Sequence, residues 1–193
     1  MARWEPDARG RLLQAAVELF DDRGYDATTA AQVAERAGLT KTTLFRHFAD
    51  KREILFQGQD ELVALAVGAV ESAPRQSTPY EIARGSVRAL CSIHIEERRD
   101  IRRRLVTILP SSAELMERAV FKRSAVTEAL RSALAARIGD SRRAGVLADA
   151  AIRAYYDGYA SWVASGERGS LADVVDGELD AFAAALGDAL HTR

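Results

Sequence analysis

The chain has 193 residues, of which 48% are hydrophobic and 28% charged, and its formal net charge is -1. This composition predicts a globular protein of one large or two small domains. It excludes long disordered regions. Because the net charge is close to zero, it also excludes a protein whose overall positive charge attracts nucleic acid. The single cysteine, Cys91, excludes an internal disulfide, and the longest wholly apolar run, residues 62–70, is too short to cross a bilayer. We therefore expect a cytoplasmic protein without a membrane segment.

The first predicted helix begins near Pro6, which suits a first helical turn, and ends at Gly24. Its apolar residues fall at helical spacing on one side. They are Leu12, Leu13, Ala16, Val17 and Phe20. Such a stripe has to be buried against a partner, and the nearest apolar faces lie within the first 50 residues.

Two short helices joined by a glycine turn come next. Thr29 caps the first of them, with Gln32 placed to bond back to the cap, and Gly38 ends it in the left-handed conformation that glycine tolerates. Thr40 then caps the second helix. Two short helices with such a turn indicate a helix-turn-helix, whose second helix enters the major groove of DNA.

The second short helix has an inner and an outer side. With Leu44 and Phe48 facing inward, the helical period places four residues on the outer side: Thr42, Thr43, Phe45 and Arg46. From residue 36 to 52 there are five basic residues against one acid, a local excess of positive charge that suits a phosphate backbone. The alternative is a solvated face of an ordinary all-helical protein.

These residues resemble a known family. Gly24-Tyr25-Asp26-Ala27-Thr28-Thr29, Val33 to Lys41, and Thr43 to Phe48 followed by Lys51 are similar in order and spacing to the DNA-binding domain of TetR-family transcriptional regulators. The resemblance covers about the first quarter of the chain. It is more specific than a generic helix-turn-helix pattern.

The resemblance implies a role for each matching position. Thr29 would cap its helix and touch a phosphate, Lys41, Thr42 and Thr43 would approach base edges, and Lys51 would meet a phosphate. Arg46 adds charge to the same face, and Phe45 and His47 would lie along the phosphate and groove wall.

This chain departs from the family pattern at two positions. It has Phe45 where the family usually has tyrosine, and Thr42 where the family often has glycine or proline. A phenolic phosphate contact is therefore lost at position 45, while position 42 gains a hydroxyl. Both changes bear on which operator sequence is read.

The remainder of the chain also has helical periodicity. Caps, prolines and glycines predict helices from Asp50 to Ser72, from Thr78 through His94, around the arginine-rich residues 98–104, from Ser111 to Gly139, from Asp140 to Val163 and from Ser170 to Leu190. No strand is evident. We predict an all-α protein of about nine helices, with a three-helix DNA-binding domain at residues 1–50 and a helical effector-binding and dimerisation domain at residues 51–193.

The last two predicted helices have more apolar surface than one side of a small domain needs. Their small and aromatic residues suit a close helix interface, and the family resemblance implies a two-fold dimer contact. The predicted interface residues are Ala151, Ala154, Gly158, Trp162, Leu179, Phe182 and Leu186. A monomeric core is the alternative.

We also expect a small-molecule pocket in the second domain. Helix faces suggest apolar walls from Leu62, Ala66, Leu105, Leu109, Met116, Val126, Tyr155 and Tyr159, with Cys91 and His94 as polar groups. Metal binding through Cys91 and His94 is a weaker alternative, because no second ligand motif accompanies them. The arginine cluster 98–104 is open to three interpretations: a solvated helix junction, nucleic-acid contact or binding of an anion.

Together these features predict a homodimeric transcriptional repressor that binds a palindromic operator in duplex DNA and is released by a small, mostly apolar effector. We expect no enzyme activity, no cofactor and no metal. Two alternatives stay open: an enzyme or metal-binding bundle that also carries a DNA-binding unit, and a regulator without a small-molecule effector.

Overall fold

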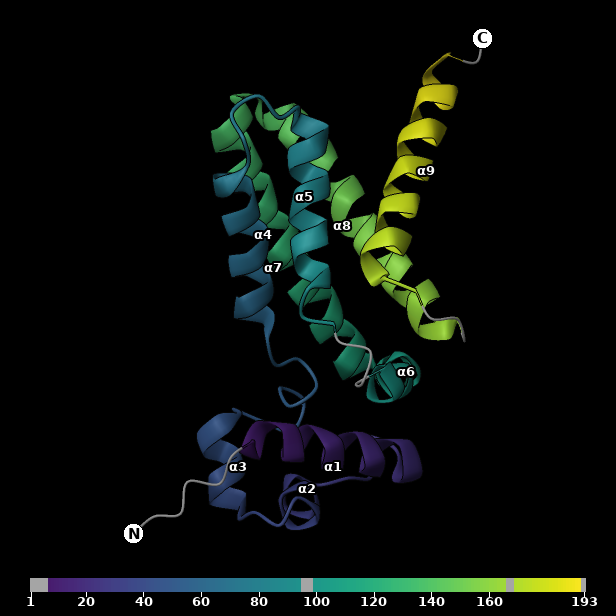
Figure 1. Cartoon of the computed structure of the whole chain (residues 1–193). Coiled ribbons are helices and arrows are strands. Elements are labelled where there is room, and N and C mark those ends of the chain that lie inside the picture. The colour runs from purple at the N-terminus through teal and green to yellow at the C-terminus, as the bar shows by residue number, and fades with distance from the viewer. Residues whose placement is uncertain (1–6, 95–98, 166–168, 192–193) are drawn as a thin grey trace. The chain divides into compact units, whose positions relative to one another are not determined.

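The structure is a computed structural model that describes residues 7–94, 99–165 and 169–191 (Figure 1). Within these residues it contains nine α-helices, one short 3-10 helix and no strand, which confirms the all-α prediction. The elements are α1 (Ala8–Arg23), α2 (Ala30–Arg36), α3 (Lys41–His47), α4 (Gln59–Ser72), α5 (Pro79–Cys91), α6 (Arg99–Ile108), the 3-10 helix (Leu109–Ser111), α7 (Ala113–Ile138), α8 (Ser141–Ala164) and α9 (Leu171–His191).

The chain forms two compact units. Unit 1 consists of the residues up to Gln57 together with Asp100–Val120, and unit 2 consists of Gly58–Arg99 together with Phe121–Arg193. Unit 1 thus holds α1 to α3 and also α6 and the first turns of α7. The functional division at residue 50 stays a prediction.

Side-chain caps set the starts of the helices in unit 1. Oδ1 of Asp7 accepts a hydrogen bond of 2.9 Å from the Gly10 amide. Thr29 and Gln32 form the predicted reciprocal capping box. The Thr40 hydroxyl accepts from the Thr43 amide at 3.1 Å. These caps satisfy amide groups that a helix leaves without partners in its first turn. Pro6, predicted to begin α1, lies outside the described residues.

The predicted helix from Asp50 to Ser72 is shorter than expected. Asp50 accepts the expected hydrogen bond from the Glu53 amide, at 3.0 Å. However, residues 51–58 form turns, and α4 begins only at Gln59. Gly58 has φ 87°, a left-handed conformation that a right-handed helix cannot pass through. The apolar residues Ile54 and Leu55 are buried nonetheless, as part of the core of unit 1.

Unit 1 has a continuous apolar core. The inner faces of α1, α2 and α3 meet there, together with residues of the 51–58 turns, α6 and α7. Its largest fully buried side chains are Leu12, Val17, Val33, Leu44, Ile54 and Leu115.

Unit 2 is a helical bundle in which α5 packs against α4, α8 and α9, and α8 packs against α9 (Figure 1). Thr78 opens α5 with the predicted capping box, and Asp140 caps α8. The buried Asp176 carboxylate of α9 forms ion pairs with two arginines of α5, Arg84 at 3.1 Å and Arg88. These ion pairs connect α9 to α5 beside the apolar core.

The predicted dimer residues differ in how far they are buried within a single chain. Ala151, Ala154, Gly158, Trp162 and Leu179 are buried inside a single chain, because α5 and α9 cover the apolar face of α8. The dimer contact of these five residues stays a prediction. Phe182 is half-buried and Leu186 is 51% exposed, and for these two the interface stays a prediction.

The described helices include none that combines the length and the apolar character needed to cross a membrane.

Gly158 makes the contact between α8 and α9 possible. A Cβ added to it would lie 2.9 Å from Val175 Cγ2 and 3.0 Å from Val175 Cα. We predict that Gly158→Ala destabilises the protein by about 1–3 kcal/mol, because the backbones of the two helices have to move apart. The matched control is Gly177→Ala on α9, where an added Cβ meets nothing within 4 Å. There alanine should stabilise by about 0.5–1 kcal/mol through helix propensity.

Urea unfolding followed by circular dichroism checks both variants, with a lower midpoint expected for Gly158→Ala and a higher one for Gly177→Ala. Equal upward shifts would contradict the close packing of α8 on α9.

Candidate nucleic-acid interface

Helix α3 has a buried and an exposed face. Leu44 is fully buried in the core of unit 1, whereas Phe45 is 45% exposed. Lys41, Thr42 and Arg46 are exposed on the same helix. The structure therefore brings these four predicted DNA-binding residues together at the surface. The Lys41 ammonium lies 5.7 Å from the centre of the Phe45 ring, so a positive charge and an apolar ring are neighbours on this face.

The remaining predicted DNA-binding residues have intramolecular contacts. The Thr43 hydroxyl lies 2.9 Å from the Thr40 hydroxyl within the cap of α3. His47 is half-buried beside the Phe48 ring, and exposed Thr29 forms the cap of α2. The positions of these three residues neither support nor contradict a contact with DNA, so their contacts stay predictions.

Arg11 of α1 holds the turn between α2 and α3. Its guanidinium donates to the carbonyl oxygens of Ala37 and, at 3.4 Å, Gly38. Gly38 has φ 68°, and a Cβ there would lie 2.7 Å from Arg11 Nη2. The glycine is therefore required both for the turn and for the approach of the arginine. The role of Arg11 was not predicted, because a contact 26 residues away leaves no local pattern.

Lys51 has a similar position at the loop that precedes α2. Its ammonium donates to the carbonyl oxygens of Tyr25, at 2.6 Å, and Thr28, at 2.8 Å, and lies 4.0 Å from the centre of the Tyr25 ring. The side chain is half-buried rather than extended into solvent. In the structure Lys51 thus stabilises the loop that positions α2, a role that the sequence did not predict.

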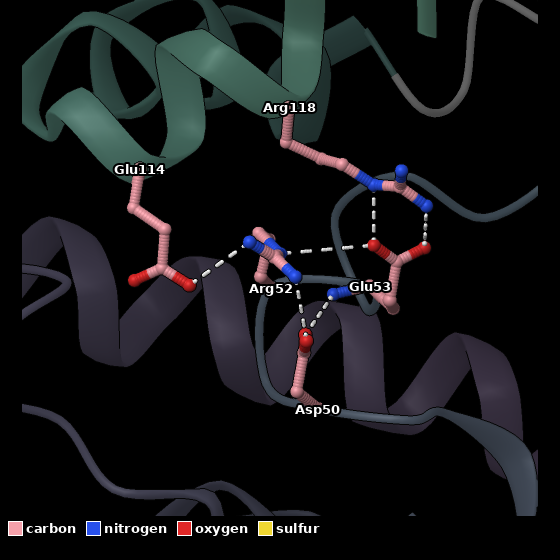
Figure 2. A network of polar contacts seen from close by, with 5 residues as sticks. All are labelled: Asp50, Arg52, Glu53, Glu114 and Arg118. Carbon is pink, nitrogen blue, oxygen red and sulfur yellow. Dashed lines mark hydrogen bonds and ion pairs between the residues drawn. The ribbon is translucent and has the colours of Figure 1, made fainter. Parts of the chain in front are cut away.

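A network of charged residues connects the segment after α3 to α7 within unit 1 (Figure 2). Arg118 of α7 binds the Glu53 carboxylate with two parallel hydrogen bonds of 2.5 and 2.9 Å. Arg52 lies between the carboxylates of Asp50, at 3.0 Å, and Glu114, at 3.3 Å. Bidentate pairs of this kind hold a fixed geometry, so residues 50–53 have a defined orientation relative to the start of α7.

Tyr25 belongs to the same region. Its burial, and after that the charge and hydrogen bond of Glu114, raise the pKa of the Tyr25 hydroxyl well above its usual value. The phenol therefore stays protonated at neutral pH and donates to the carboxylate. Glu114 thus connects α7 both to the loop before α2 and to Arg52.

The arginine cluster lies partly outside the described residues, which exclude Arg98. Within unit 1, Arg103 pairs with Asp100 at 3.3 Å and Arg104 lies 3.8 Å from Asp21 of α1. Both arginine side chains are about half exposed. Weak surface pairs of this kind do not distinguish among the three interpretations of the cluster, which all stay predictions.

The predicted pocket residues fall in different parts of the structure. Leu62, Ala66, Val126, Tyr155 and Tyr159 belong to the apolar core of unit 2 or pack against it. Leu105 and Leu109 pack against the core of unit 1, and Met116 is 45% exposed there. The effector role of these residues stays a prediction.

Cys91 and His94 both line a cavity of about 300 Å³ in unit 2. Burial raises the pKa of the Cys91 thiol to about 12, with the charge of Asp176 as the next cause. The thiol stays protonated at neutral pH, which disfavours a metal-binding thiolate. Nε2 of His94 is hydrogen-bonded to the Tyr155 hydroxyl. Among the described residues no group of three or more His, Cys, Asp or Glu side chains is placed to hold a metal ion.

The geometry of unit 1 agrees with a known family. Residues 12–57, which include most of α1, all of α2 and α3, and the turns after them, match the family described as bacterial regulatory proteins, tetR family. Over these residues the chain is similar to the TetR family.

Several regulators of transcription resemble this chain over its N-terminal part. The HTH-type transcriptional activator FasR of Mycolicibacterium smegmatis is 40% identical over 72 residues, 37% of this chain and 33% of that protein. The HTH-type transcriptional repressor KstR2 of Mycobacterium tuberculosis is 42% identical over 55 residues, 28% of this chain and 26% of that protein. The chain therefore matches about a third or less of the length of these relatives.

The likeness to solved structures extends over nearly the whole chain. A transcriptional regulator of Aquifex aeolicus has a TM-score of 0.56 and covers 92% of this chain and 99% of its own length, at 18% sequence identity. At this identity the likeness shows the fold alone. It confirms an N-terminal helix-turn-helix followed by a helical domain.

The pair of Arg118 and Glu53 can be tested by a double-mutant cycle. We predict that Arg118→Met and Glu53→Gln, alone and combined, give a coupling energy of about 1–3 kcal/mol in unfolding experiments. The reason is that the pair is bidentate and its side chains are only 25% and 18% exposed. The control cycle is Arg131 with Glu128, 44% and 61% exposed, for which we expect less than about 1 kcal/mol. A coupling at Arg118 no larger than that of the control would show that the network does not hold residues 50–53.

Proposed function

We propose that this protein is a cytoplasmic transcriptional regulator of the TetR family that binds duplex DNA through α3. The observation that carries the proposal is the exposed face of Lys41, Thr42, Phe45 and Arg46 on a helix whose other face is anchored by buried Leu44. Lysine and arginine reach phosphates and guanine acceptors, and a threonine hydroxyl contacts either bases or phosphates. The phenylalanine ring suits a thymine methyl group.

We further propose that the protein acts as a homodimer on a palindromic operator. A single seven-residue α3 reads few base pairs, whereas a two-fold pair of helices reads two half-sites about one DNA turn, 34–36 Å, apart. Exposed Leu186 and half-buried Phe182 leave apolar surface on α9 for such a contact.

The expected outcome of binding is repression that a small effector relieves. KstR2 is named a repressor and FasR an activator, so both outcomes occur among relatives of this chain. The effector would act by population shift, favouring a dimer in which the two α3 helices no longer match the operator spacing. A bundle with catalytic activity is less favoured, because these relatives are named as regulators of transcription.

Selection of bound duplexes from a random DNA pool, at a stated salt concentration, tests the proposal. We predict an enriched palindrome with two half-sites. The combined substitution Lys41→Ala and Arg46→Ala should abolish the enrichment while leaving the oligomeric state unchanged in light scattering. A wild-type protein that enriches no sequence would contradict the proposed function.

Lys41 and Lys51 differ in what they are expected to contribute to DNA affinity. Removing a lysine that neutralises a phosphate lowers the slope of log affinity against log salt by about 0.9. We predict that Lys41→Met shows this loss on a mixed-sequence duplex. Lys51→Met should keep the wild-type slope and instead lower the free energy of unfolding by about 1–3 kcal/mol, since two carbonyl oxygens lose their donor.

Salt titrations of both variants, measured under conditions where circular dichroism shows them folded, make the comparison. If Lys51→Met lowers the slope as much as Lys41→Met does, then Lys51 contacts a phosphate, as the family resemblance implied.

A further inference from the structure

Two segments of unit 1 enclose the helix-turn-helix: residues 25–28, which lead into α2, and residues 50–53, which follow α3. We call these two segments together the frame. The Lys51 ammonium joins them, since it donates to the carbonyl oxygens of Tyr25, at 2.6 Å, and Thr28, at 2.8 Å. A displacement of residues 50–53 is therefore passed to the loop from which α2 begins.

Helix α7 binds both segments of the frame. Arg118 holds the Glu53 carboxylate with two parallel hydrogen bonds of 2.5 and 2.9 Å (Figure 2). Glu114 lies 3.3 Å from the Arg52 guanidinium and accepts a hydrogen bond from the Tyr25 hydroxyl. Glu114 and Arg118 are four residues apart, so they lie on the same face of α7. One face of a single helix thus holds the frame on both sides of the helix-turn-helix.

These contacts are partly shielded from water and supported by packing. The Arg118 and Glu53 side chains are only 25% and 18% exposed. Leu115, next to Glu114 on α7, is fully buried in the core of unit 1, and so is Ile54, next to Glu53. The first turns of α7 are therefore an integral part of unit 1.

Helix α4 follows the frame in sequence but does not continue it. Residues 51–58 form turns, and Gly58 has φ 87°, so no regular helix runs from residues 50–53 into α4. Helix α4 also belongs to unit 2, whereas the frame belongs to unit 1. The support for the frame therefore comes from α7.

We propose that Glu114 and Arg118 are positioning residues for DNA recognition, which act on α2 and α3 through the frame and do not contact DNA themselves. The inference deepens the proposed function and rests on it. Base readout requires the side chains of α3 at fixed positions relative to base edges, whereas non-specific binding requires only positive charge near phosphates. Loss of an α7 contact therefore lowers the affinity for a specific sequence more than the affinity for other DNA.

Fluorescence anisotropy with the full chain, on a duplex selected from the random pool and on a mixed-sequence duplex, tests the inference. All variants are compared under conditions where circular dichroism shows them folded. Arg118→Met should lose about tenfold in affinity for the selected duplex, because its supporting contact is gone, and less than about threefold for the mixed-sequence duplex. The control Arg131→Met removes the same charge from α7 at a side chain that is 44% exposed, and it should stay within about threefold of the wild type on both duplexes.

Glu53→Gln separates positioning from simple electrostatics. If charge alone matters, removing a negative charge strengthens the attraction to DNA. If position matters, Glu53→Gln loses about tenfold on the selected duplex, as Arg118→Met does. The combined variant should then lose no more than about twofold beyond either single variant, because both substitutions break the same contact.

Equal losses of Arg118→Met on the two duplexes would overturn the inference. An unchanged or higher specific affinity of Glu53→Gln, or losses that multiply in the combined variant, would overturn it as well. If the wild-type protein selects no duplex, the proposed function fails and the inference fails with it. The wild-type protein alone therefore distinguishes the two failures.

Discussion

The orientation of α3 depends on packing, because α2 and α3 have only seven residues each and helices this short are not stable alone in water. Buried Val33 and Leu44 attach the two helices to α1 through the core of unit 1. Two charged side chains donate hydrogen bonds to backbone carbonyl oxygens around these helices. Arg11 binds the turn between α2 and α3, and Lys51 binds the loop before α2. The exposed face of α3 has a defined direction only because the buried face and these carbonyl contacts are in place.

The charged network extends this constraint to α7. Arg118 and Glu114, both on the first turns of α7, bind Glu53 and Arg52 in the segment that follows α3 (Figure 2). Glu114 also accepts a hydrogen bond from the Tyr25 hydroxyl in the loop before α2. Unit 1 is therefore more than the first 50 residues, since residues distant in sequence complete it. This gives a physical reason why an isolated N-terminal fragment would lack contacts that position its recognition helix.

The local features of the fold were predictable from sequence, and the long-range ones were not. Thr29, Thr40 and Thr78 were identified as caps because capping is a pattern of neighbouring residues. The turns at 51–58 were missed because Asp50 and Glu53 look like a helix start, and only the backbone shows that Gly58 is left-handed. The partners of Arg11 and Lys51 lie 23 to 27 residues away, a separation over which no periodicity carries information. The apolar face of α8 was expected to contact a second copy, and within the chain α5 and α9 already pack against this helix.

The central claim is that α3 binds DNA with its exposed face while Arg11 and Lys51 hold the backbone behind it. A crystal structure of the protein with a selected duplex tests this most directly. In that complex we expect α3 in the major groove, with Lys41, Thr42, Phe45 and Arg46 in contact with bases or phosphates. The Lys51 ammonium should still contact the carbonyl oxygens of Tyr25 and Thr28. A complex in which DNA contacts another surface, or in which Lys51 leaves those carbonyls for a phosphate, would contradict it.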